Sequence, residues 1–427
     1  MTTAPTGSGS APAASPDIPA DRPRVPGERR LLTGLMANSV VLYAVYGAVP
    51  SVLLANLVAD VDPGSKSTSL GIISAIGAFG AMLANPIAGA LSDRTHGRFG
   101  RRAPWMAGGA LLGGLALIAV GAGNGLLWIC VAWTLAQIFL NGLQAPLTAV
   151  IPDRTPEGRR GLFSSAAGLA QMLGATVGTA VAAGFADALG LGFAVFGVLV
   201  ILGTAVFLLL NREPAAAAPQ GEPFRWKTFL AGFWVSPRRH PDFAWAFLGR
   251  FLLILGYYCV FSYQLYVLDD YLGLTRDRAN DLVPLLSLAM LPGMIVMIVV
   301  SGPWSDRVGR RKPFVIAASL GMAIALTLPL VLRSEASMFV YAVLSGCAFG
   351  MYMAVDTALM TQVLPRPDEA AKDMGVLNIA NALPQALAPA VAAGVIGLVG
   401  GYRSLFVTAI LLVVLGALSI VPIRSVR

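Results

Sequence analysis

Two charged residues, Arg250 and Asp356, stand deep inside long apolar segments of the sequence, 242–268 and 336–364. Arg250 is eight residues from the start of the first segment, and Asp356 is eight residues from the end of the second (250 − 242 and 364 − 356). If both segments are helices that cross a membrane in opposite directions, both side chains lie roughly 12 Å from the same membrane face. An unpaired charge at the centre of a span costs roughly 2.5–3.5 kcal/mol. We therefore expect the two residues to pair. We also expect Asp356 to bind and release a proton, and binding of the proton to release Arg250.

Two other interpretations of this pair stay open. The ion pair could be a permanent structural bridge between the two helices. Alternatively, the Arg250 side chain could extend to the membrane interface and leave Asp356 without a partner. In both cases neither residue would exchange a proton.

Polar and aromatic side chains recur at spacings of three, four or seven residues in five apolar segments, which places each set on one helical face. The sets are Ser39, Tyr43 and Tyr46; Trp133, Gln137, Asn141 and Gln144; Arg250, Tyr257, Phe261 and Gln264; Phe349, Tyr352 and Asp356; and Asn378, Asn381 and Gln385. An amide in hydrocarbon needs a partner, so each set either bonds a neighbouring helix or faces a wet cavity.

Rings beside amides suit a neutral polyhydroxylated ligand, because rings cover its C–H faces while amides reach its hydroxyls. We expect the substrate to be bound by Tyr43, Tyr46, Trp133, Gln137, Asn141, Gln144, Tyr257, Gln264, Tyr352, Asn378, Asn381 and Gln385. Hydrogen bonding between helices is the alternative role for each amide.

The elements that position these residues are twelve apolar segments. The chain has 427 residues, of which 56% are hydrophobic and 12% charged, and an apolar segment of about 20 residues can cross a bilayer. The segments are 31–59, 68–92, 103–122, 125–151, 160–185, 190–211, 242–268, 280–304, 313–332, 336–364, 371–398 and 402–422. This pattern predicts an all-α membrane protein with twelve transmembrane helices. Buried helices of a soluble protein would not need so many long apolar runs.

The basic residues predict the orientation. With the N-terminus inside, 24 of the 30 Lys and Arg residues fall in cytoplasmic segments, and five fall in outer loops: Lys66, Arg276, Arg278, Arg333 and Arg403. An excess of Lys and Arg in short loops marks the cytoplasmic side. We expect both termini in the cytoplasm and the chain in the plasma membrane, and we attribute the net charge of +8 to topology rather than to nucleic-acid binding.

The sequence contains an internal repeat. Ser92-Asp93-Arg94 and Ser305-Asp306-Arg307 are each followed by Gly-Arg-Arg and, two residues on, by proline. Asp93 and Asp306 are 213 positions apart, as are Pro152 and Pro365 (306 − 93 and 365 − 152). A duplicated half in a membrane chain is typical of transporters that rock between two states. We expect a disordered cytoplasmic tail at 1–28 and a six-helix bundle at 29–211. A cytoplasmic linker at 212–241 would join it to a second, pseudo-symmetric six-helix bundle at 242–427.

The paired loops and the twelve segments resemble the major facilitator superfamily over about residues 30–425. Within it, the residues from Asn85 to Trp105 and the run from Asn378 to Gln385 resemble the glycoside–pentoside–hexuronide and sucrose transporter-like branch. The resemblance implies transport by alternating access, with the cavity between helices 1, 4, 7 and 10.

The resemblance also implies a cytoplasmic gate. In this superfamily the acid after helix 2 faces the start of helix 11, and helix N-termini attract carboxylates. By symmetry Asp306 would face the start of helix 5, near Gly161. The expected gate residues are Asp93, Arg94, Arg98, Arg101, Arg102, Asp306, Arg307, Arg310 and Arg311. Residues that serve topology alone are the alternative.

Several functions are excluded by residues the sequence lacks. The chain has no phosphate-binding loop, and its two histidines, His96 and His240, fall in loops, so we expect no enzyme, no metal site and no cofactor. A channel is a further alternative, although the duplicated halves favour alternating access. The segments 68–92 and 125–151 lack the acids that bind sodium in melibiose-type members, so protons are the expected coupling ion. We expect a monomer that moves a small neutral sugar or glycoside. A drug–proton antiporter is the alternative, but efflux members of the superfamily carry a Gly-Pro pair in helix 5, and segment 160–185 lacks one.

Overall fold

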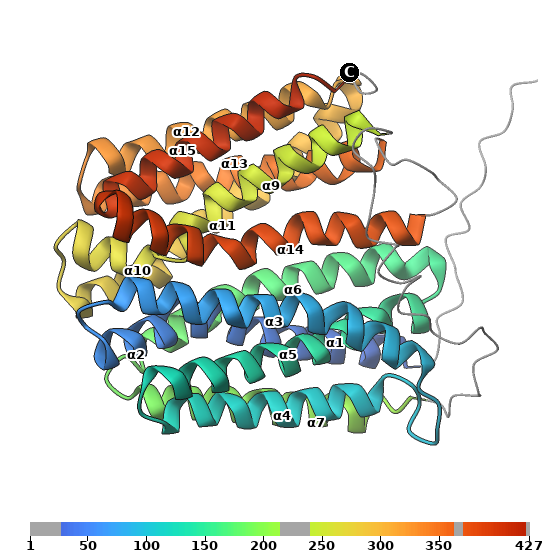
Figure 1. The fold of residues 1–427 in the computed structure, drawn as a ribbon. Helices are drawn as coiled ribbons and strands as arrows, with labels where there is room; N and C mark the ends of the chain where they lie inside the picture. The colour runs from blue at the N-terminus through green and yellow to red at the C-terminus, as the bar shows by residue number, and fades with distance from the viewer. Residues whose placement is uncertain (1–26, 214–239, 363–369, 424–427) are drawn as a thin grey trace, which may run out of the picture.

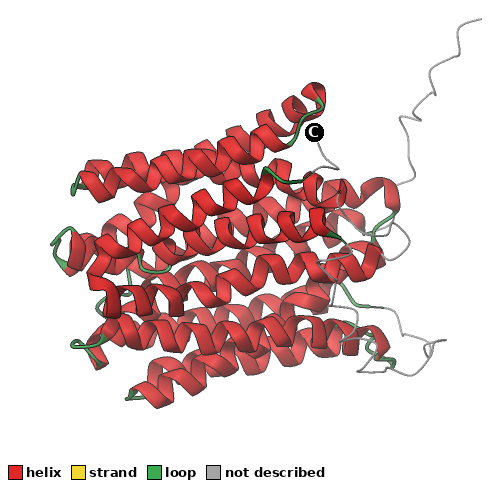
Figure 2. Cartoon of the chain, turned by 45° about the horizontal axis from the view of Figure 1, so that its top comes forward, coloured by secondary structure: helices red, strands yellow, loops and turns green. Residues whose placement is uncertain are grey.

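The computed structural model of the protein describes residues 27–213, 240–362 and 370–423, and within these ranges it leaves out the side chains of 157–158, 357–358, 361–362 and 370–378. This part of the chain consists of helices joined by short loops and contains no strand (Figure 2). The predicted tail and most of the predicted linker, residues 1–26 and 214–239, lie outside it.

The first half of the chain forms six membrane-length helical segments (Figure 1). They are α1 with the π-helical turn η1 and α2 (Glu28–Ala48, Val49–Leu53 and Leu54–Val61), α3 (Lys66–Arg94), α4 (Ala103–Ala122), α5 (Leu126–Arg154), α6 (Glu157–Ala183) and α7 (Leu189–Leu210).

The second half repeats this arrangement. Its segments are α9 with α10 and η2 (Pro241–Phe261, Gln264–Tyr266 and Val267–Tyr271), α11 (Arg276–Val308), α12 (Lys312–Val331), α13 (Glu335–Gln362), α14 with η4 (Ala370–Val395 and Ile396–Gly400) and α15 (Gly401–Ile420). The prediction of twelve transmembrane helices in two bundles is thus confirmed. Among the described residues, length and hydropathy give eleven long apolar helical stretches, and the last of them, Ile379–Ile420, joins most of α14 to α15. The chain reverses between these two helices at Gly400 and Gly401, both at positive φ (Figure 1).

Glycines allow the helices within each half to touch along their backbones. In the first half, Gly174 and Gly178 of α6 lie against the backbone of Val40 and Ala44 in α1. In the second half, the glycines at 346 and 350 of α13 lie in the same way against Met290 and Met294 of α11. Small residues at such contacts are typical of helix packing in membranes. The halves meet along α3 with α14 and along α6 with α11.

The predicted helix 242–268 is interrupted, which is a correction to the sequence analysis. α9 ends at Phe261, and the chain resumes as α10 and η2, which extend to Tyr271. At the break, the Ser262 hydroxyl donates to the carbonyl of Tyr258, a local bond that competes with regular helix. The Tyr263 hydroxyl donates to the carbonyl of Ser67 in the other half. The break therefore lies where the two halves meet.

The bundle has two ends, because its long helices run roughly side by side (Figure 1). The Lys66 end carries Lys66 and Arg276, the first residues of α3 and α11. The Asp93 end carries Asp93 and Asp306, in the last turns of the same two helices. The sequence predicts the Lys66 end to be outside the cell and the Asp93 end to be cytoplasmic.

Candidate functional site

The structure brings Arg250 of α9 and Asp356 of α13 together. The Arg250 Nη1 atom lies 3.3 Å from the Asp356 Oδ2 atom, and the two residues are 8% and 2% exposed. Charge-assisted bonds between such groups are usually about 2.7–2.9 Å long. Arg250 Nε, both carboxylate oxygens of Asp356 and the Tyr352 hydroxyl are buried without a hydrogen bond of good geometry. The site can therefore form more polar contacts than it makes in this state.

Aromatic side chains extend from this ion pair along α9 and α13. The ring of Tyr257 is stacked between Phe261 and Phe349, with centroid distances of 5.4 Å and 4.7 Å. Phe349 in turn lies 6.5 Å from Tyr352, which is one helical turn before Asp356. The predicted residues Tyr257, Tyr352 and Asp356 thus form one continuous cluster. Phe261 and Phe349, which the sequence places on the same helical faces, also belong to it.

The first half holds a second polar cluster, on α1 and α5. The Gln144 amide donates to the Tyr43 hydroxyl at 2.8 Å, and the ring of Tyr43 meets Tyr46 edge-on at 5.5 Å. The Tyr46 hydroxyl and the Gln137 Oε1 atom are buried and have no hydrogen-bond partner. The Asn141 amide donates to the backbone carbonyl of Gln137. Unpartnered buried polar atoms are costly unless a ligand or water completes them.

The other predicted substrate-binding residues have different surroundings. Trp133 is 1% exposed and packs against α3 at Gly77, where a Cβ would lie 2.8 Å from its ring; its Nε1 atom is buried without a hydrogen-bond partner, as is the Gln137 Oε1 atom. Gln264 is buried in α10 at the break after α9. The Gln385 amide donates to the carbonyl of Asn381 within α14. The side chain of Asn378 lies outside the described residues.

Arg102 organises a polar cluster at the Asp93 end. It is 6% exposed, forms ion pairs with Asp93 of α3 and Asp153 of α5, and donates to the Ser92 hydroxyl at 2.6 Å. Arg101 adds an ion pair with Asp153 at 2.8 Å. One buried guanidinium thus ties the loop after α3 to α5.

Glu213, just after α7, completes this cluster. Its carboxylate accepts hydrogen bonds from the backbone N–H groups of Arg102 at 2.8 Å and Ala103 at 3.0 Å, at the N-terminus of α4. Unpaired N–H groups and the helix dipole make that position favourable for a carboxylate. Gly100 lies against Glu213, at a φ of +81° where a side chain would also collide with it. Sequence analysis missed Glu213 and Asp153 as functional residues; their positions directly after apolar segments were the available signal.

The two gate acids each pair with an arginine of their own half in this state. Asp93 pairs with Arg102, and Asp306 pairs with Arg311 at 3.0 Å. A Cβ at Gly161, in the first turns of α6, would have no neighbouring atom within 4 Å. The remaining predicted gate residues are exposed: Arg94, Arg98, Arg307 and Arg310. The side chains at the start of α14, which Asp93 was expected to face, lie outside the description.

Glu213→Ala is expected to lower the stability of the protein by about 1.5–3 kcal/mol, because it removes a charged acceptor from two backbone N–H groups. Glu213→Gln keeps one acceptor oxygen and should lose less. The measurement is the thermal unfolding temperature of the purified protein in detergent. Equal unfolding temperatures for the parent and both variants would contradict the assigned contact.

Comparison with known proteins gives the family and the fold. A family model described as Major Facilitator Superfamily matches residues 31–298 and 247–426. A protein of Aspergillus flavus (strain ATCC 200026 / FGSC A1120 / IAM 13836 / NRRL 3357 / JCM 12722 / SRRC 167), named MFS transporter asaE, is 29% identical over 170 residues. That match covers 40% of this chain and 36% of the fungal protein, so it spans about a third of the relative.

Three solved structures share the fold at low sequence identity. The nucleoside transporter NupG is 13% identical with a TM-score of 0.73, over 93% of this chain and 100% of that chain. A bacterial homolog of the human lysosomal transporter Spinster, in an inward-facing and occupied conformation, is 16% identical with a TM-score of 0.72, over 93% and 97%. A D-xylose-proton symporter is 18% identical with a TM-score of 0.69, over 93% and 98%.

Proposed function

Because the chain belongs to the Major Facilitator Superfamily, we propose that it is a secondary active transporter that moves a small neutral sugar or glycoside by alternating access, coupled to protons. The observation that carries the proposal is the buried pair of Arg250 and Asp356, whose polar atoms are incompletely hydrogen-bonded beside an aromatic cluster. A buried carboxylate facing an arginine can hold or release a proton as its partner moves. A D-xylose-proton symporter has the same fold, so the fold is compatible with transport of a sugar together with a proton.

In the proposed cycle the substrate binds between the two polar clusters. The rings of Phe261 and Phe349 would cover its C–H faces, while Gln137 and Tyr46, whose polar atoms are unpartnered in this state, would reach its hydroxyls. Protonation of Asp356 would release Arg250 and couple the proton to the change of state. The glycoside–pentoside–hexuronide and sucrose transporter-like branch, the plasma membrane and cytoplasmic termini belong to the same proposal.

The gate also has a part in this cycle. Asp93 and Asp306 would leave their own arginines and face the opposite half when the Asp93 end closes. Arg102 and Arg311 are the partners that each acid would exchange. The two-fold repeat makes both exchanges alike, as expected for halves that rock about a central site.

The test is uptake of radiolabelled sugars, glycosides and nucleosides by proteoliposomes that contain the purified protein and have an alkaline interior. We expect one sugar or glycoside to accumulate with saturation, and a protonophore to collapse the accumulation. Flux that rises without saturation would identify a channel. Export of dyes in exchange for protons, with no sugar uptake, would identify the drug–proton antiporter instead.

A further inference from the structure

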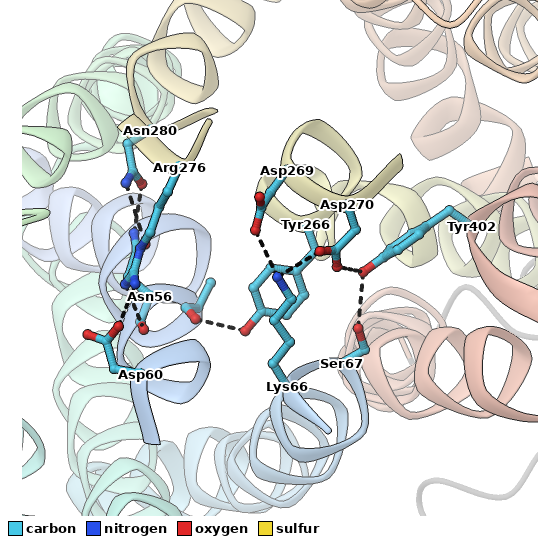
Figure 3. A network of polar contacts seen from close by, with 11 residues as sticks. Asn56, Asp60, Lys66, Ser67, Tyr266, Asp269, Asp270, Arg276, Asn280 and Tyr402 are labelled. Atoms are coloured by element: carbon cyan, nitrogen blue, oxygen red, sulfur yellow. Dashed lines mark hydrogen bonds and ion pairs between the residues drawn. The ribbon is translucent and has the colours of Figure 1, made fainter. Parts of the chain in front are cut away.

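A network of polar contacts joins the two halves at the Lys66 end (Figure 3). Lys66, the first residue of α3, places its Nζ atom 2.8 Å from Asp269 and 2.8 Å from Asp270, both in η2 of the other half. The same ammonium group lies 4.9 Å from the centre of the Tyr266 ring. The start of the second spanning helix of one half thus binds the end of the first spanning helix of the other.

Arg276, the first residue of α11, makes the reciprocal connection. Its Nε donates to the Asn56 side chain at 2.6 Å and its Nη2 to the Asn56 carbonyl at 3.0 Å, while Nη1 pairs with Asp60. Asn56, on α2, also donates to the Asn280 side chain at 2.7 Å. Asn56 and Asn280 are 1% and 3% exposed. Here the second half reaches the end of the first helix of the first half.

The internal repeat relates these two connections. Asn56, the main acceptor of Arg276, and Asp269, an acceptor of Lys66, are separated by 213 positions (269 − 56), the offset that relates Asp93 to Asp306. Each cation is the first residue of its helix, and each acceptor lies in the last turns of the first spanning helix of the opposite half. The cations themselves are 210 positions apart (276 − 66), so the acceptors correspond in the repeat while the cations differ by three positions.

The backbones of the halves also approach closely around the network. Tyr266 donates from its hydroxyl to the carbonyl of Ala55 at 2.7 Å. The hydroxyl of Tyr402, in the second half, shares a hydrogen bond with the Ser67 hydroxyl of the first half at 3.1 Å. Gly71 of α3 lies against α14, where a Cβ would collide with Ala393 and lie 2.8 Å from the Pro389 carbonyl. The Lys66 end is shut in this state.

We propose that Lys66 and Arg276 are the positioning residues of a double latch that holds this end shut and must release on both sides before substrate can enter or leave there. The inference rests on the proposed transport function. Both sides of the latch combine charge with burial: the Lys66 side chain is 17% exposed and binds two carboxylates, whereas the Arg276 side chain is 40% exposed and binds buried Asn56 as well as Asp60. Loss of either cation therefore opens this end.

The test measures access to Ala393→Cys, a small change at the seam between α3 and α14, in a variant whose Cys130, Cys259 and Cys347 are replaced by serine. Intact cells are treated with a charged, membrane-impermeant maleimide. We expect Arg276→Ala to raise the labelling rate about tenfold, as loss of charge-assisted hydrogen bonds worth about 1.4 kcal/mol would give. Lys66→Ala should also raise it, and Lys66→Arg should retain the parent rate.

The matched control is Arg278→Ala, two residues from Arg276. Arg278 binds Glu335 of its own half at 2.7 Å and makes no part of the latch, so its loss should leave labelling unchanged. Equal labelling rates for Arg276→Ala, Arg278→Ala and the parent would overturn the latch. Gly71→Val adds a side chain between α3 and α14 while every latch residue stays in place, so it should also speed labelling. Labelling of Gly71→Val at the parent rate would contradict opening between these two helices. Labelling needs neither substrate nor gradient, so it can succeed even if the uptake assay rejects the proposed substrate.

Discussion

Asp356→Asn is expected to abolish accumulation of substrate against its gradient while leaving substrate binding and exchange intact. Asparagine resembles the protonated acid in shape, and it cannot release a proton when Arg250 returns. A gradient of about one pH unit supports about tenfold accumulation at one proton per substrate, because 1.4 kcal/mol corresponds to a factor of ten. The variant should lose all of that factor.

The measurement pairs two assays on the same proteoliposomes. Gradient-driven uptake should fall to equilibration, whereas exchange of internal for external labelled substrate should continue at a rate similar to that of the parent. Asp281→Asn removes an exposed acid of α11 and is the matched control. Normal accumulation with normal pH dependence in Asp356→Asn would show that Asp356 is not the coupling residue.

The fold followed from the sequence because each element carries its own signal. Apolar runs of about 20 residues locate the spans, and the 213-residue offset divides them into halves. The meeting of Arg250 and Asp356 also followed, because depth in a membrane can be counted along a helix. Counting residues along a helix gives the depth of a side chain in the membrane and the helical face on which it lies, but it does not identify the neighbouring helix.

The other contacts between distant segments were for that reason not predictable. Lys66 and Arg276 counted only as outer topology residues, since their acceptors lie on the other half. Glu213 was hidden in the same way, because a carboxylate after one helix gives no sign that it accepts from the start of another. Trp133 and Gln137 share a helical face, and both lie beside Gly77 of α3. Periodicity could not separate packing from binding on one face.

Gly178→Leu is expected to prevent the first half from assembling. A Cβ at Gly178 would overlap the backbone of Ala44 in α1, and a backbone cannot move aside as a flexible side chain does. Overpacking of a core typically costs about 1–3 kcal/mol when side chains can adjust. A collision with backbone exceeds that range, and it would push α1 and its Tyr43 away from α5.

Gly168→Leu, in the same helix, is the control for this substitution. A Cβ at Gly168 would meet open space, so the variant gains the same helix propensity without the collision. The measurement is the yield of monodisperse protein in mild detergent and its unfolding temperature. Gly168→Leu should match the parent, whereas Gly178→Leu should give little folded protein. Equal yield and unfolding temperature for the two variants would mean that α1 and α6 do not pack backbone to backbone, and the placement of Tyr43 beside Gln144 would lose its support.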